Sequence, residues 1–106
     1  MAWQTINDSN GRPSPRPGID LNIDNEGHRE YKVTFRVFTN DPLDGPNQAI
    51  RTPGLPLPGS IYTYGNDTDV EAWCRNTTSV KPIRIDNSNV TALDLTYTYS
   101  TKPALS

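Results

Sequence analysis

Few residues in this chain of 106 have side chains suited to catalysis. The sequence contains one histidine, His28, and one cysteine, Cys74, so there is no Ser-His-Asp spacing to test. His28 lies in a polar turn, which is typical of a solvated imidazole without a partner. Cys74 belongs to an apolar alternation, as a small core residue does. We therefore predict that the protein is not an enzyme and has no catalytic residues.

A row of oxygen-bearing side chains at a spacing of two resembles the first half of a calcium-binding loop. Its members are Asp20, Asn22, Asp24 and Glu26. The pattern then fails, because Asn25 stands where glycine is expected and Tyr31 stands where the terminal glutamate is expected. The apolar residues between the acidic ones suit a strand better. We expect no metal and no cofactor.

Two features could serve binding instead of chemistry. The prolines at positions 53, 56 and 58 could form a polyproline ligand, but their spacing fits a stiff spacer better. Aromatic residues on alternating β positions could form a sugar-binding platform, although such residues are more often core. These aromatic residues are Tyr31, Phe35, Tyr97 and Tyr99.

Charge and composition exclude several classes of protein. Ten basic and twelve acidic residues are interspersed, so there is no basic stripe for nucleic acid. A single cysteine excludes an internal disulfide framework and favours a reducing compartment. The first residues lack the pattern of a signal peptide, and no apolar run is long enough to cross a membrane. A hydrophobic content of 33% predicts a marginal core that is completed in an assembly.

The sequence pattern predicts that most of the chain forms β-strands. Ten prolines and seven glycines exclude long helices. Alternating apolar and polar residues predict strands at 19–24, 30–39, 60–64, 70–75, 80–86 and 91–101. We therefore expect an all-β fold, a small sandwich or partly open barrel of five or six short strands with a long extended N-terminal arm. The arm covers residues 1–29, and the β domain covers 30–106 with a Pro/Gly-rich connection at 40–60, whose stretch 47–51 forms a helical turn or a short strand.

The alternation also predicts which side chains form the core. The expected members are Tyr31, Val33, Phe35, Val37, Ile61, Val70, Ala72, Cys74, Ile83, Ile85, Leu93, Leu95, Tyr97 and Tyr99.

The arm carries most of the functional expectation. Prolines 13, 15 and 17 keep it extended, which lowers the entropy lost when it docks. We expect it to be mobile in the free protein, ordered on a partner, and removable up to residue 18 without unfolding the β domain. The marginal core and exposed strand edges also favour a homodimer or higher homo-oligomer. The predicted partner-binding residues are Trp3, Ile6, Arg12, Arg16, Ile19, Leu21, Ile23 and Phe38.

Four segments resemble small structural proteins of tailed bacteriophages. They are YKVTFRVFTNDP at 31–42, LPLPGSIY at 55–62, DVEAWC at 69–74 and LDLTYTYS at 93–100. The resemblance lies in strand and turn style, and it implies a virion component made in the host cytoplasm, with no catalytic residues. It implies first a capsid cement or decoration protein that clamps neighbouring major capsid subunits through its arm. A tail, neck or baseplate subunit is the alternative within the particle, and a carbohydrate- or peptide-binding β module is the alternative outside it.

Overall fold

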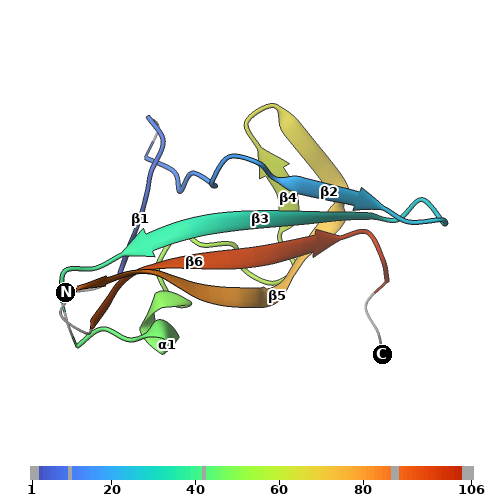
Figure 1. Cartoon of the computed structure of the whole chain (residues 1–106). Coiled ribbons are helices and arrows are strands. Elements are labelled where there is room, and N and C mark those ends of the chain that lie inside the picture. Colours follow the sequence, from blue (N-terminus) through green and yellow to red (C-terminus); the bar gives the residue numbers. More distant parts are fainter. Residues whose placement is uncertain (1–2, 10, 42, 87–88, 104–106) are drawn as a thin grey trace.

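A computed structural model of the chain describes residues 3–9, 11–41, 43–86 and 89–103. Its strands are β1 (Gln4–Thr5), β2 (Asp20–Ile23), β3 (Arg29–Phe38), β4 (Ile61–Tyr64), β5 (Asp67–Asp86) and β6 (Asn89–Ser100), and its helix is α1 (Pro46–Ala49). One antiparallel sheet holds the strands in the order β1-β3-β6-β5-β4, with β2 also beside β3. This sheet curls into an open half-barrel (Figure 1). The prediction of an all-β, partly open barrel is confirmed.

The centre of the sheet is the long pairing of β3 with β6. Polar and apolar residues alternate along both strands, so each strand has one apolar face. The register places Phe35 opposite Leu95, both buried, and Arg36 opposite Asp94 on the outer face, where they form an ion pair of 2.9 Å. The buried inner residues of the two strands are Tyr31, Val33, Phe35, Val37, Leu93, Leu95, Tyr97 and Tyr99, as predicted.

Two contacts curl the sheet by joining strands that are not neighbours in it. Tyr31 in β3 stacks on Tyr62 in β4, with ring centroids 4.0 Å apart and an angle of 17° between the planes. The Nε of Arg29, also in β3, donates a hydrogen bond of 2.6 Å to Asp69 in β5. Because β6 and β5 separate β3 from β4 in the sheet, these contacts draw its two sides together.

Strand β5 is where the predicted core needs correction. The predicted strands at 70–75 and 80–86 are one continuous strand of 20 residues, with register shifts along its pairings. Figure 1 shows its first part running with β4 and its second part beside β6. Each shift adds residues on one strand only and reverses which side chains face inward. Three predicted core residues of β5 are exposed as a result, namely Val70, Ile83 and Ile85, and Ile61 in β4 is exposed as well. Tyr62 takes the inner position in β4.

The N-terminal segment is extended, and it lies on its own sheet. Trp3 is buried in the core, and its indole N–H donates to the carbonyl of Gly45. Beyond β1, the N–H of Arg16 donates to the carbonyl of Thr34 at 2.7 Å. Strand β2 then pairs with the first residues of β3. The described residues 3–9 and 11–23 and the β domain therefore share one sheet and one core.

The long connection between β3 and β4 packs against the same segment. The stretch 47–51, predicted as a helical turn or a short strand, overlaps α1, whose Ala49 is buried, and Leu55 follows it into the core. Gly54 has a φ of +92°, and a Cβ there would lie 2.8 Å from Cγ of Pro13. Glycine at this position therefore allows the close approach of the arm. No helix in the described part of the chain has the length and apolar character needed to span a membrane.

Candidate partner-binding surfaces

The structure separates the predicted partner-binding residues into three places. Trp3 lies in the core of its own chain, with 3% of its surface exposed. A second group lines two cavities between the N-terminal segment and β4: Arg12, Arg16, Ile19 and Leu21. The remaining residues, Ile6, Ile23 and Phe38, are exposed elsewhere on the surface. Partner binding by these residues stays a prediction.

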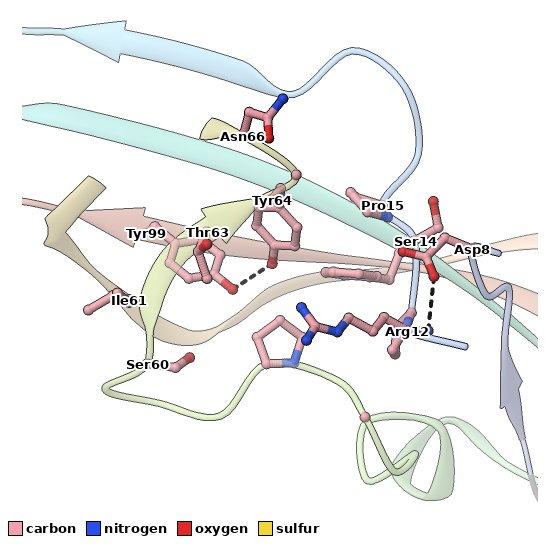
Figure 2. A pocket seen from close by; sticks show the side chains of 15 residues that line it. Asp8, Arg12, Ser14, Pro15, Ser60, Ile61, Thr63, Tyr64, Asn66 and Tyr99 are labelled. Carbon is pink, nitrogen blue, oxygen red and sulfur yellow. Dashed lines mark hydrogen bonds between the residues drawn. The ribbon is translucent and has the colours of Figure 1, made fainter. Parts of the chain in front are cut away.

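The larger cavity, which we name the Arg12 cavity, has a volume of about 710 Å³. Its first wall is formed by residues 8 and 12–15 of the N-terminal segment, and its second by β4 with the flanking residues Ser60 and Asn66. Figure 2 shows the Arg12 side chain reaching into the space between these walls. The position of Arg12 is fixed because its main-chain N–H donates to the Asp8 carboxylate and its carbonyl accepts from the N–H of Asp8.

A pair of tyrosines lies deeper in the Arg12 cavity. The hydroxyls of Tyr64 and Tyr99 are 2.6 Å apart and share a hydrogen bond (Figure 2). Burial raises the pKa of Tyr99 to about 12 and raises the pKa of Tyr64 as well. Both hydroxyls are therefore neutral near pH 7, and the pair supplies polar packing without an ionised group.

The smaller cavity, the Arg16 cavity, has a volume of about 470 Å³. It lies further along the N-terminal segment, is lined by Arg16, Ile19 and Leu21, and reaches the stacked Tyr31 and Tyr62. The two cavities share one lining residue, proline 15. Both are therefore parts of the space left open where the half-barrel does not close.

The charged groups near these cavities hold the fold together. Arg29 donates to Asp69, and Tyr31 donates to the same carboxylate at 2.8 Å. The hydrogen bond from Arg29 lowers the pKa of Asp69 from 3.8 to about 2. Such an arrangement is a structural ion pair between β3 and β5, because all of its donors come from the chain itself.

The residues considered for calcium and for catalysis have structural partners. Asp24 accepts hydrogen bonds from the main-chain N–H groups of Glu26 and His28, and its other oxygen lies 3.2 Å from Nδ1 of His28. It therefore closes the turn between β2 and β3. Burial raises the pKa of the Cys74 thiol, which disfavours the thiolate. No cluster of His, Cys, Asp or Glu among the described residues could hold a metal ion.

Exposed apolar side chains on β2 and β5 form further candidate surfaces for binding a partner. Strand β2 is exposed along its whole length, with Leu21 48% and Ile23 63% exposed. On β5, Val70 and Trp73 are also more than half exposed, at 64% and 52%. Trp73 is not among the partner-binding residues predicted from the sequence, although its position between the inward-facing Ala72 and Cys74 is a signal of an outward-facing aromatic residue.

Comparison with known proteins gave no relative. No family model, no curated protein and no solved structure matches this chain.

Proposed function

We propose that this protein is a non-enzymatic structural subunit of a virion that binds neighbouring proteins through the β2 edge of its sheet. Our lead proposal is a capsid cement or decoration protein that binds the major capsid protein. Support comes from the resemblance of four segments to phage structural proteins and from one surface feature, the exposed β2 edge.

That surface feature carries the proposal. Within the described chain, β2 pairs with β3 alone, so its other edge carries backbone donors and acceptors that no strand takes up. Leu21 and Ile23 add apolar side chains to the same four-residue strand. An edge strand that is both unpaired and apolar is a ready site for pairing with another chain.

A second copy of this chain is the simplest first partner. Two β2 strands can pair antiparallel about a two-fold axis, because the same surface then meets itself. Such a dimer would continue the sheet of one copy into the sheet of the other. It would leave the Arg12 cavity, whose lining includes no residue of β2, open to other ligands.

Mass spectrometry of purified particles that contain the chain tests the assignment to a virion. A cement protein is expected in hundreds of copies, in fixed ratio to the major shell protein, whereas a neck, tail or baseplate subunit is expected in a dozen or so. A chain absent from washed particles contradicts the proposal.

A matched pair of variants tests the surface. Ile23→Asp places a charge on the β2 edge, and Ile85→Asp places one at a residue that is also 63% exposed but belongs to β5. We expect Ile23→Asp to lower dimer formation in light scattering and occupancy on particles, and Ile85→Asp to change neither. Equal behaviour of the two variants contradicts the role of β2.

A peptide-binding module is the second candidate function. The Arg12 cavity favours it, because this cavity combines a charged group, an aromatic floor and a strand edge. Binding of this kind is compatible with a virion subunit and also with a protein outside any particle.

A further inference from the structure

Arg12 lies on the open side of the half-barrel, and its charged side chain forms no ion pair among the residues that the structure describes. In the part of the chain that the structure describes, the guanidinium of Arg12 has no hydrogen-bond or ion-pair partner, since its contacts with Asp8 run through the main chain. Figure 2 shows this side chain lying inside the cavity. A guanidinium offers five N–H donors in a planar fork that matches a carboxylate.

A free strand edge lines the same cavity. Among the described strands, β4 pairs with β5 alone and ends the sheet, and its residues Ile61 and Thr63 line the cavity. Across the space stand Pro13 and Pro15, which have no N–H to donate. An extended segment entering the cavity can therefore form a ladder with β4, while its other side meets the N-terminal segment.

The aromatic floor favours a peptide over a sugar. A sugar stacks on an open ring face, but Tyr64 already packs against Phe35, Tyr62 and Tyr99, with centroids 5.2–6.0 Å away. Its hydroxyl is occupied by Tyr99. The floor thus offers apolar surface for a side chain and leaves the recognition of polar groups to β4 and Arg12.

We propose that the Arg12 cavity binds an extended peptide segment that carries an acidic side chain. The peptide adds as a strand to the free edge of β4, and its carboxylate accepts hydrogen bonds from the Arg12 guanidinium. This inference rests on the second candidate function, the peptide-binding module, and specifies its ligand. It concerns a surface separate from the β2 edge and does not require a virion.

The test uses the full chain and a short fluorescent peptide of alternating threonine and valine with one central glutamate. Fluorescence anisotropy measures its binding against two matched peptides, one with glutamine in place of glutamate and one N-methylated at alternate amides. We expect the glutamine peptide to bind about tenfold more weakly, equivalent to about 1.4 kcal/mol. We expect the N-methylated peptide to lose binding, because it cannot complete the ladder.

Variants of Arg12 and Arg16 test which arginine binds the peptide carboxylate. Arg12→Gln should bind the glutamate and glutamine peptides equally, whereas Arg16→Gln changes an arginine of the neighbouring cavity and should keep the tenfold preference. Arg12→Lys should keep part of that preference. Near-ultraviolet circular dichroism of the tyrosine cluster checks the fold of each variant, and the comparison of peptides on the wild-type protein is decisive if Arg12→Gln is misfolded.

Three outcomes would overturn the proposal. One is equal binding of the glutamate and glutamine peptides to the wild-type protein, and another is no binding of either. The third is tight binding of an acidic oligosaccharide, such as a polygalacturonate fragment, in place of the peptides, which would assign the cavity to sugars. None of these results bears on the β2 edge, so this inference and the proposed function can fail separately.

Discussion

The indole N–H of Trp3 donates a hydrogen bond of 2.9 Å to the carbonyl oxygen of Gly45, at the residue that precedes α1. This bond joins the N-terminal segment to the connection between β3 and β4, two parts of the chain that are 42 residues apart. The ring itself is buried in the core. The two segments with least regular structure therefore depend on each other through one side chain.

Trp3→Ala should lower the free energy of unfolding by about 3–5 kcal/mol, the usual cost of removing a large buried aromatic ring. Trp73→Ala is the matched control, because Trp73 is 52% exposed and its loss should cost much less. Urea denaturation of both variants measures the difference. Deletion of residues 1–18 should likewise destabilise the β domain, contrary to the expectation from sequence. Equal stabilities of the two tryptophan variants would show that Trp3 is not part of the core.

Gly54→Ala should destabilise the protein more than Gly59→Ala does. Both glycines have a positive φ, +92° and +89°, so an alanine costs about 1–2 kcal/mol of backbone strain at either position. Only at Gly54 does the added Cβ meet another group, Cγ of Pro13 at 2.8 Å. The excess over Gly59→Ala, measured by thermal unfolding, isolates the contact of the arm. Identical melting temperatures of the two variants would show that the arm moves away from the added Cβ without a loss of stability.

Acid should weaken the protein over a defined pH range through Asp69. Its folded pKa of about 2 lies below the ordinary 3.8, because Arg29 donates to the carboxylate. The stabilisation is thus present above about pH 4 and is lost as the pH falls through 2. Asp69→Asn should unfold at a lower denaturant concentration at pH 7 and show a smaller change between pH 4 and 2. A wild-type stability that is flat across that interval would refute this assignment.

Alkaline pH should unfold the protein through its tyrosines. Burial raises the pKa of Tyr62 and of Tyr99 to about 12, above the ordinary 10, and raises that of Tyr64. Their contribution to stability is therefore complete below pH 10 and is lost as the pH rises through 12. Tyrosinate absorbance and far-ultraviolet circular dichroism, recorded together, should change in one transition. Ionisation of all five tyrosines near pH 10 with the fold intact would contradict this.

The sequence predicts the centre of this fold well because the information there is local. Strict alternation along β3 and β6 identifies the buried face, from Tyr31 to Val37 and from Leu93 to Tyr99. The same method fails in β5, where it selects Val70, Ile83 and Ile85 for the core, because register shifts against β4 and β6 change which side chains face inward along the strand. Such shifts depend on the partner strands and leave no mark in the alternation of β5 itself.

The candidate site was predictable only in part. Arg12 and Arg16 stand out in the sequence as charges among prolines, but the wall opposite them comes from β4, far along the chain. Trp3 was expected on a partner because its apolar neighbours in sequence are too few to form a core. The core that receives it is assembled from β3, β6 and the connection, which only the folded chain brings together.

The pairing of β3 with β6 sets an order for events during synthesis of the chain. Glu30 pairs with Ser100 and Phe38 with Ala92, so β3 leaves the ribosome long before its main partner exists. Until then the inner face of β3, with Phe35 at its middle, has no β6 to cover it. Pairings this distant in sequence form slowly, and an uncovered apolar strand is prone to aggregation. The nascent chain should therefore need a chaperone most between the emergence of β3 and that of β6.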